Sequence, residues 1–144
     1  MCLWSNPDTT KEWQSKHRAG NDARVYKVVR RIKRADGSFM LISPLRHLDG
    51  YFEYKVGVNE SDADPNIKPI MLRDWKIINQ GIHVFLKWDM ANLAVSCWGN
   101  DKGDCVVVPV WVSPLELLGV NQSEAAFLSV RLEQKDYEEA LKCV

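Results

Sequence analysis

The feature that most constrains the fold is a tight-turn signal between two runs of strand-forming residues. Ala23 to Lys33 is rich in β-branched and aromatic side chains, and Ser38 to Ile42 forms a second such run. Asp36-Gly37 lies between them, and this dipeptide favours the two-residue turns of β-hairpins. The sequence therefore predicts an antiparallel hairpin near the N-terminus. Apolar and basic side chains alternate along its first strand, so neither face is purely apolar.

The rest of the chain alternates between strand-like and helix-like segments. Further strands are expected within residues 50–58, 75–86, 105–112 and 125–132. The third of these should be central in the sheet, although Pro109 indicates an edge position or a bulge. Helices are expected at 88–95, where Gly99 closes the helix, after the cap signal Ser113-Pro114, and at 134–143. Residues 59–69 are predicted to form an exposed acidic loop.

The first 22 residues form an N-terminal arm with a signal for a short helix, capped by Thr9 or Thr10 and ending near Arg18. Trp4 and Trp13 are costly to leave in solvent, so we expect the arm to pack on the domain or on a partner copy. A length of 144 residues with 46% hydrophobic residues is typical of one globular domain. We therefore predict a single α+β domain over residues 1–144. It has a mostly antiparallel twisted sheet with the N-terminal hairpin, short helices on one side and a C-terminal helix.

Several classes of protein are excluded by the composition. No apolar run approaches the roughly 18 residues of a membrane-spanning helix, and the N-terminus lacks the features of a secretory signal. We therefore expect a cytoplasmic protein, in the cytoplasm of a host cell, without a membrane partner. The four cysteines and three histidines are scattered singly, which argues against a zinc site. We expect reduced thiols, no metal and no cofactor.

Charge is unevenly distributed along a chain whose formal net charge is zero. Residues 1–58 hold eleven Lys or Arg against six Asp or Glu, whereas residues 101–144 hold four against eight. Arginine forks and aromatic rings can hold an anionic ligand, although charges on a hairpin can also protect a sheet edge. A net charge of zero argues against general nucleic-acid binding. The candidate residues for binding a ligand or partner lie in the hairpin: Arg24, Tyr26, Lys27, Arg30, Arg31, Lys33 and Arg34.

No sequence motif of a known catalytic class is present. His83 lies within the strand Gly81 to Phe85, where it could act as an acid or base, or be satisfied by a neighbouring polar group. Cys2 would become an N-terminal nucleophile if Met1 were removed, and is otherwise a small apolar residue. Ser43 is a further candidate nucleophile. These three residues are the weak catalytic candidates.

Five short motifs together resemble small, uncharacterised proteins of bacteriophage and prophage genomes. They are Met1-Cys2-Leu3-Trp4, Arg24 to Val28, Ser43-Pro44, Gly81 to Phe85 and Val112-Ser113-Pro114. The chain departs from that pattern at Leu86-Lys87, where a Ser or Thr helix cap is expected, and in its long acidic loop. The resemblance implies no established activity. It implies a context in which small accessory proteins bind a host defence protein or sequester a nucleotide signal.

Three hypotheses remain open. The first is a non-catalytic binding protein of phage origin, such as a counter-defence inhibitor, which acts on a host protein or a small anionic ligand through the basic hairpin. The second is a small enzyme for a nucleotide or acyl substrate with His83 near a cleft. The third is a self-assembling structural protein, a homo-oligomer in which the basic third of one copy meets the acidic third of another.

Overall fold

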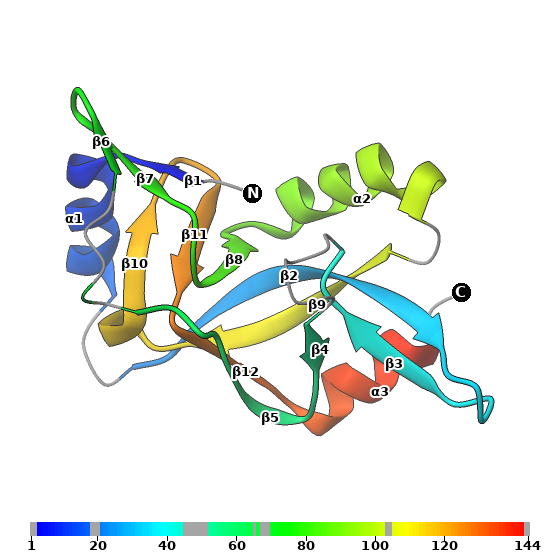
Figure 1. Cartoon of the computed structure of the whole chain (residues 1–144). Helices are drawn as coiled ribbons and strands as arrows, with labels where there is room; N and C mark the ends of the chain where they lie inside the picture. The colour runs from blue at the N-terminus through cyan, green and yellow to red at the C-terminus, as the bar shows by residue number, and fades with distance from the viewer. Residues whose placement is uncertain are drawn as a thin grey trace.

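The computed structural model describes residues 3–17, 21–44, 52–64, 66, 70–102 and 105–142 (Figure 1). It is an α+β domain, as the sequence predicts. Its elements in chain order are β1 (Leu3–Ser5), α1 (Pro7–Lys16), β2 (Ala23–Lys33), β3 (Phe39–Ile42), β4 (Glu53–Tyr54), β5 (Gly57–Glu60), β6 (Ile70–Leu72), β7 (Trp75–Ile78), β8 (Ile82–Phe85), α2 (Trp88–Lys102), β9 (Cys105–Val112), the 3-10 helix η1 (Pro114–Glu116), β10 (Leu117–Val120), β11 (Glu124–Phe127), β12 (Ser129–Leu132) and α3 (Gln134–Lys142). No helix within these residues is both long and apolar enough to cross a membrane.

The predicted hairpin is formed by β2 and β3. Their register runs from Lys33 opposite Phe39 to Arg30 opposite Ile42. Gly37 has a φ of 91°, a conformation that glycine adopts without steric cost. The Asp36 carboxylate accepts hydrogen bonds from the main-chain N–H and the hydroxyl of Ser38. These local contacts explain why the turn could be predicted from four residues alone.

A large antiparallel sheet is built around β2 and β9, the two long strands that cross the middle of Figure 1. Its strand order is β10-β11-β8-β2-β9-β12-β5, and β2 pairs with β9 from Ala23 opposite Val112 to Arg30 opposite Cys105. Residues 105–112 are therefore central, as predicted. Pro109 lies within this central strand opposite Tyr26, so an edge position is wrong. Because β12 is registered with β9 only at Trp111, the ladder on that side needs no donor from Pro109.

Helices cover both faces of the two long strands. Ala91 of α2 packs with Val28 and Cys105, whereas Ala140 of α3 packs with Val29 and the other side of β9. Neighbouring residues of a strand point to opposite faces, so each face of β2 has its own apolar set. The short helix α2 and the C-terminal helix α3 therefore lie on opposite faces of the two long strands (Figure 1).

The N-terminal arm packs back on the domain. The cap of α1 is Asn6, not Thr9 or Thr10, because its side chain accepts hydrogen bonds from the main-chain N–H groups of Asp8 and Thr9. The Thr10 hydroxyl instead accepts the main-chain N–H of Val120 at 3.2 Å. Trp13 packs edge-on against Phe127, with the ring centroids 5.8 Å apart. The prediction that the arm packs on the domain is confirmed.

A three-stranded sheet with the order β1-β7-β6 joins the arm to the rest of the chain. The strand predicted within 75–86, centred on Ile82 to Phe85, is β8. Residues 75–78 form the separate strand β7, because the chain turns at Gly81, whose φ is 84°. A Cβ at Gly81 would lie 2.9 Å from the carbonyl oxygen of Phe127, so only glycine allows this approach. As a result β7 leaves the large sheet and pairs with β1, while β8 stays in it.

Other element boundaries also differ from those expected. The strand predicted within residues 50–58 is divided into β4 and β5 before Gly57, whose φ is 97°. β5 then continues into the predicted acidic loop as far as Glu60. The last strand is divided at Leu128, which donates to Glu116 and accepts from Ser61 through its main chain. α2 continues past Gly99 to Lys102, and the helix after Ser113 is a single 3-10 turn. Residues 50, 51, 65 and 67–69 and Cys143 lie outside the described residues.

Candidate functional site

The basic residues of the hairpin do not form one surface. Registered pairs share a face of the sheet, so Tyr26 and Arg30 lie on the face of Val28 and Cys105, where α2 packs. Lys27 and Arg31 lie on the face of Val25 and Val29, where the main core lies. The seven predicted residues are thus divided, with Arg24, Tyr26, Arg30 and Arg34 on one face and Lys27, Arg31 and Lys33 on the other.

Arg31 is a structural residue. Its side chain is buried, and Nη1 donates to the main-chain oxygen of Leu141 at 2.7 Å. The guanidinium carbon lies 4.6 Å from the centre of the Phe39 ring. A cation at the C-terminal end of a helix satisfies a free carbonyl and complements the helix dipole. Arg31 therefore fixes the end of α3 against the hairpin.

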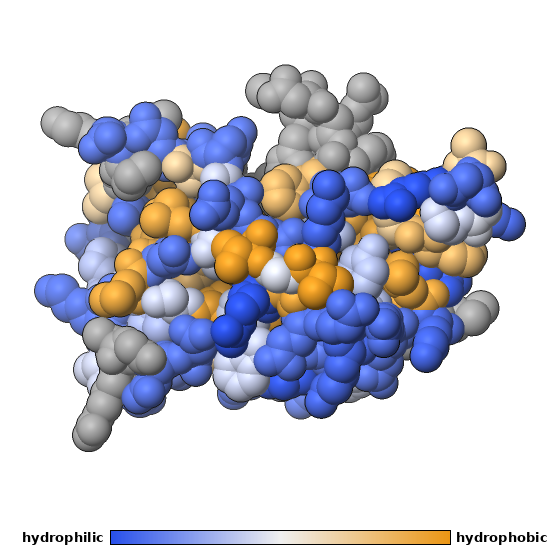
Figure 2. Space-filling model, turned by 90° about the horizontal axis from the view of Figure 1, so that it is seen from below, coloured by the Kyte–Doolittle hydropathy of each residue, from blue (hydrophilic) through white to orange (hydrophobic). Residues whose placement is uncertain are grey.

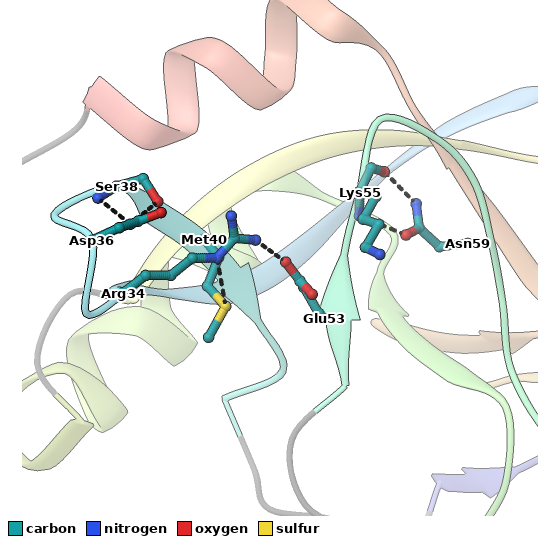
Figure 3. Close-up of polar contacts among 7 residues, drawn as sticks. All are labelled: Arg34, Asp36, Ser38, Met40, Glu53, Lys55 and Asn59. Atoms are coloured by element: carbon teal, nitrogen blue, oxygen red, sulfur yellow. Dashed lines mark hydrogen bonds and ion pairs between the residues drawn. The ribbon is translucent and has the colours of Figure 1, made fainter.

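Arg24 and Arg34 are also held by contacts within the chain. Arg24 lies 5.4 Å from the centre of the Trp111 ring, and its Nη2 is 3.5 Å from the Asp136 carboxylate. Arg34 forms an ion pair with Glu53 of β4, and its Nε lies 3.4 Å from the Met40 sulfur (Figure 3). In the described part of the chain, no hydrogen bond or ion pair joins the side chains of Arg30 and Lys33 to another residue. Among the basic residues predicted for the site, Arg30 and Lys33 are therefore the two whose side chains are available to bind an anion.

One edge of β2 brings several predicted residues together. Tyr26 and Arg30 each pair with β9 on one side, so β8, which meets Tyr26, and β3, which meets Arg30, share the opposite edge. The registered pairs on this edge stop at Tyr26 and resume at Arg30, which leaves a ladder break at Lys27, Val28 and Val29. His83 in β8 and Ser43 after β3 both flank this edge.

Lys27 reaches across the ladder break. Its Nζ donates to the main-chain oxygen of His83 at 2.8 Å and lies 5.9 Å from the centre of the Tyr54 ring. Burial lowers the pKa of Lys27 from 10.5 to about 8, and the negative charge of Glu124 opposes this fall. Burial also raises the pKa of Glu124, and Lys27 opposes that rise. Burial raises the pKa of Tyr54 well above its usual value.

The three catalytic candidates have different surroundings. The His83 ring Nε2 lies 3.3 Å from the main-chain oxygen of Gln80. The Ser43 N–H donates to the Phe52 carbonyl at 2.8 Å, and its hydroxyl accepts the Phe52 N–H at 3.2 Å. Ser43 therefore closes the end of the β3–β4 pair. Cys2 lies outside the described residues.

An apolar surface that we did not predict lies on the small sheet. Trp4, Ile77 and Ile70 are registered across β1, β7 and β6, and Trp75 is registered with Leu72, so all five side chains share one face. Four of them are exposed: Trp4 by 46%, Ile70 by 59%, Leu72 by 50% and Trp75 by 40%. We call these four residues the arm surface. The opposite face packs inward through Leu3 and Ile78.

Three residues of the arm surface, Ile70, Leu72 and Trp75, belong to the hairpin of β6 and β7, which projects from the rest of the domain (Figure 1). Met71, on the other face of β6, is also exposed, so this strand is uncovered on both sides. The turn at its tip is Arg73-Asp74, with Arg73 at a φ of 56°. A residue other than glycine with a positive φ is uncommon. The sequence signal for this hairpin is two apolar runs separated by two polar residues, without the Asn-Gly or Asp-Gly that usually marks such a turn.

Other exposed apolar side chains are less continuous. Seen from below, the molecule shows hydrophobic side chains in a band that hydrophilic ones interrupt (Figure 2). The edge strand β5 carries Val58, exposed by 64%, and α2 carries Trp88, exposed by 50%, and Leu93. Within the described residues, neither β5 nor α2 places four exposed large apolar side chains together as the arm surface does.

Comparison with known proteins identified no relative. No protein-family model, no curated protein and no solved structure matched the chain.

Proposed function

We propose that this chain is a non-catalytic binding protein and that it binds a partner protein through the arm surface. The observation that carries the proposal is the row of four exposed apolar side chains, Trp4, Ile70, Leu72 and Trp75, on one face of the small sheet. Contiguous exposed apolar surface on a folded domain marks an interaction site. Tryptophan is among the residues that dominate the binding energy of protein interfaces.

The proposal keeps the expected class of function and changes the surface. A basic hairpin that captured an anion would need its arginines uncommitted, but Arg31, Arg24 and Arg34 have partners within the chain. Arg30 and Lys33 alone are a weak basis for holding a phosphate, because they point to opposite faces of β2. The apolar surface therefore supports a protein partner better than the hairpin supports a small anion.

The resemblance to phage and prophage proteins supports a partner in the host cell. In that context we propose that the chain acts by occupying a surface of a host protein, as a counter-defence inhibitor does. An apolar surface with two tryptophans fits a partner that offers an apolar groove or helix face.

The proposal is tested by capture of a partner from bacterial lysate with three tagged forms of the protein. The double variant Ile70→Ser with Leu72→Ser makes the arm surface polar at two exposed positions of β6. Trp88→Ser is the matched control, because Trp88 is exposed to a similar extent on α2. We expect a partner that the wild type and the control retain and the arm variant loses, with purified partner confirming a tenfold or greater loss of affinity. Equal retention by all three forms would contradict the proposal.

The polar cluster at the ladder break supports a second candidate, an enzyme or receptor for a small ligand. The specific observation is the half-buried Lys27 amine, held at the His83 carbonyl and sharing a desolvated environment with Glu124. Titratable groups with shifted pKa values gather at functional sites. A ligand screen by thermal unfolding tests it: a nucleotide that raises the Tm of the wild type should have no effect on Lys27→Met. Absence of any such ligand, or equal shifts in both forms, counts against it.

A further inference from the structure

The Lys27 amine at the ladder break is suited to a reaction as well as to binding. We infer that Lys27 is a carbonyl-binding residue: its amine forms an imine with a small aldehyde, and the Tyr54 hydroxyl donates a hydrogen bond to the carbonyl oxygen. The inference rests on the second candidate function and deepens it, because it names a class of ligand for the same polar cluster. It does not involve the arm surface.

Lys27 and Tyr54 lie on the same face of the sheet. Arg31 of β2 is registered with Leu41 of β3, and Leu41 with Tyr54 of β4, so Tyr54 shares the face of Arg31 and therefore that of Lys27. The Lys27 Nζ lies 5.9 Å from the centre of the Tyr54 ring. A group bonded to Nζ would therefore lie beside the phenol.

The Tyr54 hydroxyl is a hydrogen-bond donor without an acceptor. The side chain is only 3% exposed, yet no hydrogen bond joins its hydroxyl to any residue that the structure describes. The hydroxyl of a buried tyrosine usually has a partner. Burial also raises the pKa of Tyr54 above its usual value, so the phenol keeps its proton at physiological pH. The carbonyl oxygen of a ligand would supply the acceptor that this donor lacks.

The Lys27 amine also has few partners. Nζ donates to the main-chain oxygen of His83 at 2.8 Å, and in the described part of the chain no acidic side chain forms an ion pair with it. Glu124 is near enough to oppose the fall in the pKa of Lys27, but it does not contact the amine. The Lys27 side chain is half-buried, so a small solute can reach it from solvent. A desolvated lysine without an acidic partner is the form that acts as a nucleophile toward carbonyl compounds.

Burial increases the amount of the reactive, uncharged amine. Because the pKa of Lys27 is lowered from 10.5 to about 8, about a quarter of the molecules carry the free amine at about pH 7.5, against about 0.1% for an ordinary lysine. The free amine is therefore about 200-fold more abundant at Lys27. A less basic amine is also less nucleophilic, and the slope known for thiols gives a loss of about tenfold. Lys27 should thus react roughly 20-fold faster than an exposed lysine.

The reaction needs only the amine and the aldehyde. The nitrogen lone pair forms the new C–N bond, and the carbonyl π electrons move to the oxygen, where the Tyr54 hydroxyl stabilises the growing charge. Both amine hydrogens end on the oxygen by exchange with solvent, and the oxygen leaves as water. One amine and one aldehyde therefore give one imine and one water, with no change in oxidation state.

Reductive trapping tests the inference. The folded protein is treated with butanal and cyanoborohydride at about pH 7.5, and butylated lysines are located by mass spectrometry of peptides. We expect Lys27 to be labelled about tenfold faster or more than Lys33, which is an exposed lysine of the same strand and serves as the control within each molecule. Lys27→Met should lose only the fast label. Tyr54→Phe should slow labelling of Lys27 about threefold or more without slowing that of Lys33. Circular dichroism and the Tm check that each variant is folded.

The other outcomes overturn all or part of the inference. Labelling of Lys27 in the wild type that is no faster than that of Lys33 overturns it, and this comparison needs no variant. An unchanged rate at Lys27 in folded Tyr54→Phe overturns the role of Tyr54 as the donor. If a nucleotide raises the Tm through Lys27 but butanal does not label Lys27 preferentially, the second candidate function stands and the carbonyl inference fails. If butanal labels Lys27 selectively but no nucleotide raises the Tm, the carbonyl inference stands and the nucleotide is excluded as the ligand.

Discussion

Replacing Lys27 with methionine removes the ammonium group at the ladder break but keeps a flexible side chain of similar length. In the folded protein this amine titrates at about 8, whereas its ordinary value is 10.5. Between these two pH values the unfolded chain binds a proton that the folded chain has released. The free energy of unfolding of the wild type therefore rises with pH in this window. Lys27→Met lacks this rise.

The size of the effect follows from the shift. One pKa unit is worth about 1.4 kcal/mol, so Lys27 adds about 2 to 3 kcal/mol to the wild type between about pH 7 and about pH 10. This is an upper limit, because part of the half-buried side chain meets water. At pH 7 the variant is relieved of a desolvated cation but leaves the His83 carbonyl without its donor, which costs about 1–3 kcal/mol. These terms oppose each other, so the two proteins should have similar stability at neutral pH.

Urea denaturation of both proteins at intervals from about pH 7 to about pH 10 measures the effect. The quantity of interest is the difference between their free energies of unfolding, because the raised pKa of Tyr54 destabilises both proteins equally at high pH. Lys33→Met is the matched control, since Lys33 is exposed at the end of the same strand. A difference between wild type and Lys27→Met that stays constant over this range would refute the reasoning.

Two other substitutions test how distant segments are joined. Gly81→Ala should cost about 1–3 kcal/mol more than Gly37→Ala, because both glycines have a positive φ but only at Gly81 would a Cβ meet the Phe127 carbonyl; equal losses in chemical denaturation would contradict this. Arg31→Met should cost about 1–3 kcal/mol and speed amide hydrogen exchange in the last turn of α3, because the Leu141 carbonyl loses its donor. Unchanged exchange there would show that Arg31 does not hold the helix end.

Structure that depends on near neighbours could be predicted from the sequence. The Asp36-Gly37 turn is closed by Ser38, and the Ser113 hydroxyl accepts the main-chain N–H of Leu115 as the cap signal indicates. The unbroken apolar run of residues 105–112 likewise indicated a central strand, and β9 is central in the large sheet. In each case the interactions lie within a few residues of the signal.

Structure that depends on residues far away in the sequence could not be predicted from it. The breaks at Gly81 and Leu128 exist because other segments approach there: the Phe127 carbonyl at the first, and the main chains of Glu116 and Ser61 at the second. A periodic pattern contains no information about such partners, so β7 and the division between β11 and β12 were not predicted. β6 was not predicted because its turn lacks glycine and asparagine.

The same reason explains how far the site could be predicted. The hairpin arginines were predicted to bind a ligand or partner, but the contact of Arg31 spans 110 positions and that of Arg24 spans 112. Whether an arginine is available to a ligand depends on these contacts. Lys27 was predicted as a binding residue because of its positive charge. In the structure its distinguishing property is burial, which lowers its pKa. Which of the seven residues bind a ligand or partner stays a prediction.

The pairing of β2 with β9 has a consequence for synthesis of the chain. Their registered residues, from Arg30 with Cys105 to Ala23 with Val112, are 75 to 89 positions apart. At roughly 5–20 residues per second, β2 therefore waits about 4 to 18 s for its main partner. During this time its sheet neighbours are β3 and, later, the short strand β8. A long apolar strand that waits is prone to join another chain, and charges within it discourage that pairing. The cations of β2 lie on both of its faces, so they would discourage association of the nascent strand with another chain on either face. On this view the basic hairpin serves the protein before it is folded.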